Sequence, residues 1–296
     1  MQFSRIVRSP HRFRPLRLLF VIGALASLLG ALAMNRYAAA GSRPSLVANP
    51  AVLDEVRKLQ AFKRHVETLI DARLKAEDAE HVSLYFSDLA AGPGFGIDED
   101  FRFAPASLMK VPVMMAYLKL AEEDPRLLDL RLTVSGKSDY TANQGVKPAQ
   151  RLEPGTAYTV DELLRRMIAY SDNNALVLLL GRLDKAQLEA LLGDLHVDYQ
   201  QTPDGGRISV KSYARFFNAL YNGTYLGPRM NAKALRYLEQ DDFTAGLLAG
   251  VPRGIPVAAK FGEWALGTHS EVRQLQEFGI VFHGQHPYLL GVAVQG

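Results

Sequence analysis

The segments with strand character lie at the two ends of the chain, and helical patterns fill the middle. "HVSLYFSDL" alternates as a strand does, and "AAGPG" turns the chain into a second strand near "FGI". "GIPVAAKFGEW", "QEFGIVFHG" and "PYLLGVAVQG" give three more strands near the last residue. Two of the strands can find partners only if the ends of the domain meet. The order therefore predicts an α+β fold: one five-stranded antiparallel sheet built from both chain ends, with an all-helical lobe beside it.

The helical block follows from apolar residues at helical spacing and from capping signals. A first helix over residues 53–74 precedes the strands, and "PASLMK" opens another that stops at Asp124-Pro125. "YTVDELLRRMIAYSDN" carries a capping box of Thr159 and Glu162. Four more helical segments follow, and "HVDYQQTPDGGRISVKSYARFF" is expected to run almost directly into one of them.

The first 34 residues predict an export signal or a membrane anchor. Residues 1–17 hold five arginines and no acid, and residues 18–34 form a seventeen-residue run without charge. Such a run is at the short end of a membrane-spanning helix, and the basic tail before it predicts that the N-terminus stays in the cytoplasm. A cleaved signal peptide ending near the alanines at 38–40 is the alternative. Residues 35–50 have linker composition, so we expect one folded domain over residues 51–296, outside the cytoplasm, or secreted if residues 1–40 are cleaved.

The charge balance excludes a nucleic-acid role for the folded part. Without the five N-terminal arginines, 29 basic residues remain against 31 acidic ones, although the whole chain has a pI near 9.0. A folded part without excess positive charge has no electrostatic motive to bind phosphate backbones. The chain has no cysteine, which excludes disulfides, thiolate metal sites and a cysteine nucleophile. His283 and His286 are interpreted as residues of a surface turn, so neither a metal nor a cofactor is expected.

Ser107 and Lys110 are the first candidate catalytic pair. Positions three residues apart share one face of a helix, so the lysine amine can point at the serine hydroxyl. A neutral amine can act as a base toward that hydroxyl, and burial or a nearby cation would favour the neutral form. Taken alone, the pair is also what a capping serine and a lysine reaching to solvent would look like.

Two later motifs add to this pair. Ser171, Asp172 and Asn173 lie in a short polar loop between two apolar helices, and Lys260-Phe261-Gly262 lies on a strand near the C-terminus. The loop offers a second hydroxyl to carry a proton, although Asp172 could simply cap the next helix. Gly262 permits a close approach of the strand backbone, although an edge lysine can also merely discourage aggregation.

The ordered triple Ser-x-x-Lys, Ser-Asp-Asn and Lys-x-Gly, from about residue 53 onward, resembles the class A β-lactamases and penicillin-binding proteins. The resemblance implies a serine hydrolase acting on amide bonds and no cofactor. Ser107 would be acylated, Lys110 would be its base and Ser171 would pass a proton to the leaving nitrogen. Asn173 would hold the substrate amide and steady Lys110, and Lys260 would attract a substrate carboxylate and lower the pKa of Lys110. The backbone N–H groups of Ser107 and Glu263 would form the oxyanion hole.

Three departures from the family pattern bear on substrate and turnover. Phe261 replaces a threonine or serine, which removes a hydroxyl and could reshape the binding edge. The loop that carries the deacylating glutamate in class A enzymes is missing; Asp198 and Asp204 lack its context, and Glu263 is the one speculative substitute. The chain also stops on its last strand, so either a C-terminal helix is truncated or another segment, such as the first helix, covers that face.

These features predict an acyl-enzyme at Ser107 with β-lactams or D-Ala-D-Ala-type amides, and slow deacylation. The alternatives are a D-alanyl-D-alanine carboxypeptidase or endopeptidase of peptidoglycan, and a non-catalytic module that binds cell-wall peptides on the same fold. The expected partners are a small β-lactam or a peptidoglycan stem peptide, and the membrane through the N-terminal segment.

Overall fold

A computed structural model describes residue 23 and residues 50–296, except for 91, 143, 204 and 266–272. The predicted tail, the predicted membrane segment apart from residue 23, and most of the linker therefore lie outside the described residues. Within the described part of the chain, none of the helices is both long and apolar enough to span a membrane.

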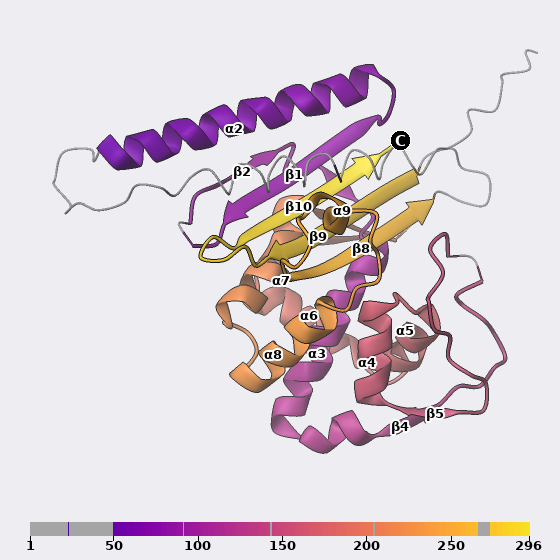
Figure 1. Ribbon diagram of the computed structural model, residues 1–296. Coiled ribbons are helices and arrows are strands. Elements are labelled where there is room, and N and C mark those ends of the chain that lie inside the picture. Colours follow the sequence, from indigo (N-terminus) through magenta and orange to yellow (C-terminus); the bar gives the residue numbers. More distant parts are fainter. Residues whose placement is uncertain (1–22, 24–49, 91, 143, 204, 266–272) are drawn as a thin grey trace, which may run out of the picture.

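One five-stranded antiparallel sheet joins the two ends of the domain, as the sequence predicts (Figure 1). The strand order is β2-β1-β10-β9-β8, so the C-terminal strand β10 pairs with β1, and β8 lies at an edge. The strands are β1 (His81–Asp88), β2 (Gly94–Ile97), β8 (Val257–Ala265), β9 (Arg273–Val281) and β10 (Tyr288–Gln295).

The long helix α2 (Pro50–Lys75) covers the outer face of this sheet (Figure 1). Phe62 and Val66 of this helix are buried in one core with Leu84 of β1 and Val292 of β10. Alternate residues of a strand face opposite sides of a sheet, so this core and the inner one are separated by the sheet itself. The sequence left open which segment covers this outer face of the sheet, and the structure confirms that the first helix, α2, covers it.

The helical lobe packs on the inner side, around α3 (Figure 1). Of the fourteen residues of α3, ten are buried, which explains why its sequence is apolar on nearly every side. The other helices of the lobe bring their apolar stripes to it or to the inner face of the sheet. The helices that follow the first are η1 (Ala106–Met109), α3 (Lys110–Glu123), η2 (Pro125–Asp129), α4 (Val160–Ala169), α5 (Asn173–Leu180), α6 (Lys185–Asp194), α7 (Val210–Asn222), α8 (Pro228–Leu238) and α9 (Leu247–Gly250).

Two small sheets complete the fold, and one of them corrects a prediction. The segment after α6 does not run directly into the next helix: it forms a hairpin of β6 (Tyr199–Thr202) and β7 (Gly205–Ser209). β7 also pairs with β3 (Arg102–Phe103), just before the turn that carries Ser107. A second pair, β4 (Arg131–Thr133) with β5 (Ala157–Thr159), closes the long segment before α4.

Candidate active site

Ser107 lies in a tight 3-10 turn rather than in the α-helix that the sequence predicts. Ala106, directly before it, has a φ of 46°, a left-handed conformation that costs a residue with a side chain about 1–3 kcal/mol. The turn is held from inside, because the buried Tyr213 hydroxyl donates to the carbonyl of Leu108 at 2.7 Å. The fold thus fixes the position of the Ser107 hydroxyl at the expense of local strain.

Lys110 begins α3 and turns its amine toward Ser107 and the Ser-Asp-Asn loop. Its side chain is fully buried, with Nζ 3.0 Å from Ser107 Oγ. Nζ also lies 2.7 Å from Ser171 O, 2.9 Å from Ser171 Oγ and 2.8 Å from Asn173 Oδ1. Within the described residues no carboxylate bonds to this amine. The structure therefore brings together four of the predicted site residues around one nitrogen.

The electrostatics of Lys110 favour the neutral amine. Burial holds the pKa of Lys110 well below its usual value, and the like charge of Lys260 lowers that pKa further. Three negative charges raise the pKa of Lys110, but each has a smaller effect than burial or Lys260: they are those of Asp172, Asp241 and Glu263. A neutral amine 3.0 Å from a serine hydroxyl can take the hydroxyl proton, which is what a general base must do.

Ser171 is placed by the end of α4 and the start of α5. Asp172 caps α5, since its carboxylate accepts from the backbone N–H groups of Asn174 at 2.7 Å and Ala175 at 3.0 Å. Ser171 itself has a φ of 51°, so the backbone is strained here as it is before Ser107. Asp172 therefore caps α5 as expected, while Ser171 and Asn173 on either side of it contact Lys110.

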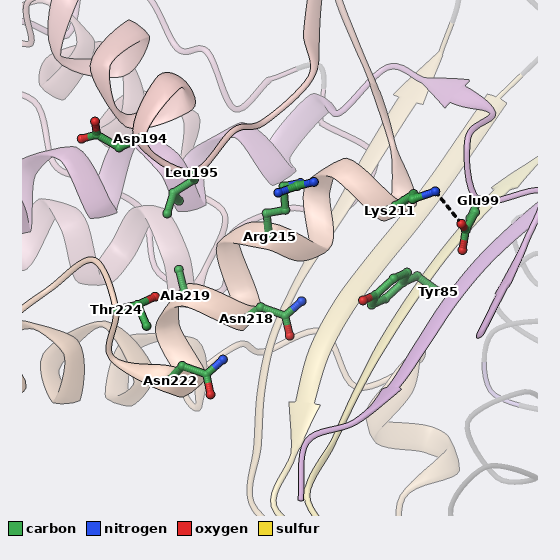
Figure 2. Close-up of a pocket in the computed structure, with 10 residues that line it drawn as sticks. All are labelled: Tyr85, Glu99, Asp194, Leu195, Lys211, Arg215, Asn218, Ala219, Asn222 and Thr224. Atoms are coloured by element: carbon green, nitrogen blue, oxygen red, sulfur yellow. Dashed lines mark ion pairs between the residues drawn. The ribbon is translucent and has the colours of Figure 1, made fainter. Parts of the chain in front are cut away.

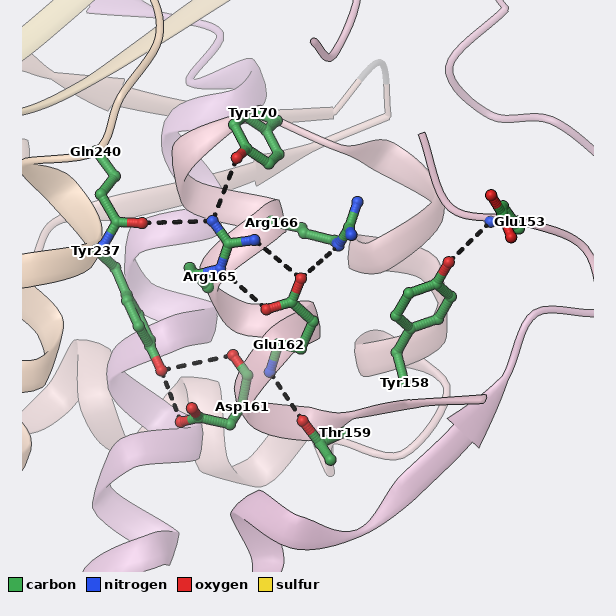
Figure 3. A network of polar contacts seen from close by, with 10 residues as sticks. All are labelled: Glu153, Tyr158, Thr159, Asp161, Glu162, Arg165, Arg166, Tyr170, Tyr237 and Gln240. Atoms are coloured by element: carbon green, nitrogen blue, oxygen red, sulfur yellow. Dashed lines mark hydrogen bonds and ion pairs between the residues drawn. The ribbon is translucent and has the colours of Figure 1, made fainter. Parts of the chain in front are cut away.

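A polar network along α4 anchors this loop (Figure 3). Thr159 accepts from the backbone N–H of Glu162 at 3.1 Å, which is one half of the predicted capping box. The Glu162 carboxylate, in place of the other half, accepts from Arg165 and Arg166. Arg165 also donates to the hydroxyl of Tyr170, the residue directly before Ser171, at 3.3 Å. The network thus ties the C-terminal end of α4 to its body.

The loop at residues 139–147 is a part of the site that the sequence did not indicate. Asn173 Nδ2 donates to the carbonyl of Tyr140 at 3.2 Å, while its Oδ1 accepts from Lys110. Gln144 Nε2 donates at 3.0 Å to Ser171 O, the same carbonyl that accepts from Lys110. The loop therefore braces the groups that hold the amine of Lys110. No short motif marks it, and only the fold brings it to this position.

Strand β8 forms the other side of the site through Gly262. A Cβ atom on Gly262 would lie 2.9 Å from the carbonyl oxygen of Pro105 and 3.1 Å from the backbone nitrogen of Leu108. Only glycine therefore lets β8 approach the turn of Ser107 this closely. The expectation that this glycine permits a close backbone approach is confirmed.

The edge of β8 also presents backbone donors. Strand β8 lies at an edge of the sheet, and the backbone N–H of Phe261 faces the carboxylate of Asp241 and lowers the pKa of that acid. Successive outward N–H groups of an antiparallel edge strand are two residues apart, so the N–H of Glu263 points off the same edge. Together with the N–H of Ser107, it is the pair predicted for an oxyanion hole.

Lys260 is fully buried, and its amine faces Asp241 rather than solvent. Nζ lies 4.0 Å from Asp241 Oδ1 and 4.2 Å from the centre of the Phe261 ring, with no hydrogen-bond partner in the described part of the chain. Burial lowers the pKa of Lys260, and burial raises the pKa of Asp241 to about 6. The cation thus acts on Lys110 through space, while its own charge is balanced by an acid that the sequence did not single out.

The side chain of Phe261 does not reshape the binding edge. Its ring is 2% exposed and stacks on Phe243 in the outer core, with ring centroids 4.1 Å apart. Alternation along β8 puts Gly262 on the inner face, so Phe261 must face outward. What Phe261 can offer a substrate is its backbone, and the expectation that its bulk changes the edge is wrong.

Glu263 is bound to the loop at residues 139–147. Its Oε1 accepts from the backbone N–H groups of Gly145 at 2.5 Å and Val146 at 2.9 Å. A Cβ atom on Gly145 would collide with this carboxylate, so the contact requires glycine there. An acid held by two N–H groups is not poised to activate water, which argues against the speculative role of Glu263 in deacylation.

The other acids considered for deacylation do not supply a base either. The Asp198 carboxylate is 67% exposed and pairs with Arg102 at the β3–β7 side of the molecule. Asp204 lies outside the described residues. In the described part of the chain, no acid therefore contacts Ser107 or Lys110.

The groove along α7 and the two histidines near the C-terminus are the other candidate sites. A groove of about 480 Å³ runs along α7, where Lys211 pairs with Glu99 at 2.7 Å (Figure 2). Its lining includes no serine and no histidine, and its one threonine, Thr224, is at the opposite end of α7 from Lys211, so no nucleophile lies beside a base. His283 and His286 lie in the turn between β9 and β10 with half-buried side chains. Among the described residues, no group of three acids or histidines could hold a metal ion.

Comparison with known protein families gives one match over most of the chain. A model of the beta-lactamase enzyme family matches residues 61–296. No curated protein matches this chain.

The solved structures similar to this chain share its fold. A mutant of PBP-A, in an acyl-enzyme complex with penicillin G, is 24% identical with a TM-score of 0.61, over 73% of this chain and 81% of that one. A variant of the last common ancestor of Gram-negative bacteria class A β-lactamase is 26% identical with a TM-score of 0.64, over 75% and 86%. A β-lactamase from Chitinophaga pinensis is 20% identical with a TM-score of 0.62, over 72% and 84%.

Proposed function

The chain belongs to the beta-lactamase enzyme family and is a serine hydrolase acting on amide bonds, and we propose that it forms an acyl-enzyme at Ser107 that hydrolyses slowly. The observation that carries the proposal is the buried amine of Lys110, which lies 3.0 Å from the Ser107 hydroxyl and has a lowered pKa. A helix-capping serine and a lysine at a solvent boundary would not need this arrangement, since burying an amine without a carboxylate partner is costly.

The distances support one sequence of proton transfers. Lys110 takes the proton of Ser107 Oγ as this oxygen attacks the substrate carbonyl carbon. The N–H groups of Ser107 and Glu263 hold the oxygen of the tetrahedral intermediate. The proton then passes from Lys110 to Ser171 Oγ, 2.9 Å away, and on to the leaving nitrogen as the C–N bond breaks. Ser107 is left as an ester of the acyl group.

Slow release is proposed because no acid contacts the Ser107 and Lys110 pair within the described residues. The β6–β7 hairpin occupies the stretch of sequence where class A enzymes are expected to carry the loop with the deacylating glutamate. A mutant of PBP-A, one of the similar structures, is an acyl-enzyme complex with penicillin G, which fits an adduct of this kind on the same fold. A β-lactam or a D-Ala-D-Ala-type amide is the proposed acyl donor.

Intact-mass spectrometry with penicillin G tests the proposal. We expect a persistent adduct of one penicillin on the wild-type protein, none on Ser107→Ala, and an unchanged adduct on the control Ser87→Ala in β1. Labelling that survives Ser107→Ala would refute the nucleophile. A short-lived adduct with product release would indicate an efficient β-lactamase instead, and no adduct would favour the non-catalytic peptide-binding module. Release of D-alanine from a peptide ending in D-Ala-D-Ala would identify the carboxypeptidase.

We also propose that residues 18–34 anchor the protein in the membrane with the catalytic domain outside the cytoplasm. The support is the five arginines before an uncharged run of seventeen residues. Protease digestion of spheroplasts tests this: the catalytic domain should be cleaved in intact spheroplasts, and protection there would contradict the proposal.

A further inference from the structure

Two glutamines of β9 hold the backbone just before the Ser107 turn. Gln274 Oε1 accepts from the backbone N–H of Ala104 at 2.9 Å, and Gln276 Nε2 donates to the carbonyl of the same residue at 2.5 Å. Both side chains are buried, Gln276 fully, although glutamine is mostly an exposed residue. Side chains from the sheet thus satisfy both backbone polar groups of Ala104.

Ala104 depends on these partners because the strand ladder ends one residue before it. β3 pairs with β7 as far as Phe103, which lies opposite Ile208, and Ala104 is buried beyond this last pair. A buried backbone N–H or C=O without a partner is costly, and nearly all such groups are paired in folded proteins. The two glutamines therefore take the place of a strand where the chain leaves β3 and enters the turn.

The packing of the sheet leaves room for Gln276 to reach the turn. On β9 this residue lies between Gly262 of β8 and Ala293 of β10, and residues paired across strands share one face of a sheet. Neither neighbour has a side chain long enough to block the path to Ala104. Gly262 thus lets β8 approach the turn and also leaves space for the amide that holds it.

Ala104 is three positions before the nucleophile, and the two residues between them have little freedom. The ring of Pro105 restricts its φ, which is −68°, and Ala106 has the left-handed φ of 46°. A strained conformation persists only where its surroundings over-determine it. Ala104 is held on one side of Ser107 and the carbonyl of Leu108 on the other, so the turn is fixed at both ends.

We infer that Gln276 is a positioning residue for acylation: by holding the carbonyl of Ala104, it keeps the hydroxyl of Ser107 in place. The inference rests on the proposed acylation of Ser107 and adds to it a buried group that acts through the backbone. Oε1 of Gln276 has no hydrogen-bond partner in the described part of the chain, so loss of the amide removes one bond there. Since a misplacement of 1 Å can cost about a hundredfold in rate, a shift of about half that size should cost about tenfold.

Gln276→Met tests the inference, because methionine has nearly the same length and no donor. The rate of penicillin G adduct formation is measured by intact mass over a range of concentrations, which separates the maximal rate from the half-saturating concentration. We expect the maximal rate to fall about tenfold and the half-saturating concentration to change by less than about twofold, because the nucleophile moves while the binding groups stay. Thermal unfolding shows that each variant is folded at the assay temperature. Gln60→Met, the same change at an exposed position of α2, should acylate as the wild-type protein does.

Gln276→Glu distinguishes the lost hydrogen bond from a general loss of packing. The protonated acid can still donate to the carbonyl of Ala104, whereas the carboxylate has no proton to donate and repels that oxygen. Burial raises the pKa of a carboxyl group, so the acylation rate relative to the wild-type protein should be nearly normal at acid pH and fall as pH rises. A loss of packing alone would lower this ratio equally at every pH. Gln60→Glu should keep a constant ratio.

The outcomes separate this inference from the function on which it rests. Acylation of Gln276→Met at the wild-type rate, or a ratio for Gln276→Glu that does not change with pH, would overturn the inference and leave the acylation of Ser107 standing. Absence of an adduct on the wild-type protein would overturn the proposed function and the inference with it. If Gln276→Met does not fold, Gln276→Glu still decides the question, since it keeps the bond at acid pH.

Discussion

Replacing Gly262 with alanine should slow acylation because β8 and the Ser107 turn are in direct contact there. The new Cβ would lie 2.9 Å from the carbonyl oxygen of Pro105, about 0.5 Å inside ordinary contact, and this neighbour is backbone that cannot rotate away. β8 must therefore shift outward, and the N–H of Glu263 shifts with it. Since a misplacement of 1 Å can cost about a hundredfold in rate, a shift of half that size should cost about tenfold.

The assay is the rate of penicillin G adduct formation at Ser107, followed by intact mass alongside thermal unfolding. Gly262→Ala should lose about 1–3 kcal/mol of stability, as overpacked cores do. The matched control is Gly193→Ala in α6, where an added Cβ meets nothing within 4 Å. The control should acylate normally and gain about 0.5–1 kcal/mol. Acylation of Gly262→Ala at the wild-type rate would refute the contact-based account of the oxyanion hole.

Two further predictions concern the buried charges. Lys260→Met removes the like charge that lowers the pKa of Lys110, so the acid limb of the acylation rate against pH should move to higher pH; an unmoved limb would contradict the assigned coupling. Glu277 is fully buried, and burial raises its pKa well above the usual range. The folded protein therefore holds this proton more tightly than the unfolded chain, and the free energy of unfolding should fall as pH rises through the raised pKa. The fall is at most about 1.4 kcal/mol per pH unit. Glu277→Gln, which can still accept from the N–H of Leu247, should lack this alkaline loss when melting temperatures are compared from pH 5 to 9, and parallel curves would disprove it.

The reading of the sequence was most reliable where a local pattern suffices. Periodicity and caps predicted α2, α4 and the strands at both ends, and the resemblance of the three ordered motifs to those of the class A β-lactamases predicted that Ser107, Lys110 and Ser171 come together. The sheet order followed from a topological need for partners rather than from any one segment. These features depend on neighbours in sequence or on a fold-wide constraint, and both can be read from a string of residues.

What could not be predicted depends on contacts between segments far apart in sequence. Asp241 balances Lys260, and Gln144 braces Ser171, yet neither acid nor amide lies in a motif. The β6–β7 hairpin was missed because its strands are four and five residues long and contain a pair of glycines, which weakens any strand signal. The orientation of Phe261, by contrast, could have been predicted from the sequence. Once Gly262 is placed on the inner face of the sheet, alternation along β8 turns Phe261 to the outer face.

The burial of Lys260 changes how the third motif is understood. A lysine on this strand was expected to attract a substrate carboxylate, but its amine is enclosed and faces Asp241 at 4.0 Å. Its effect on the site is to lower the pKa of Lys110, and that effect needs proximity rather than exposure. Lys260 can therefore favour the neutral amine of Lys110 without touching a substrate, which separates the proposed activation of Ser107 from the recognition of a substrate carboxylate.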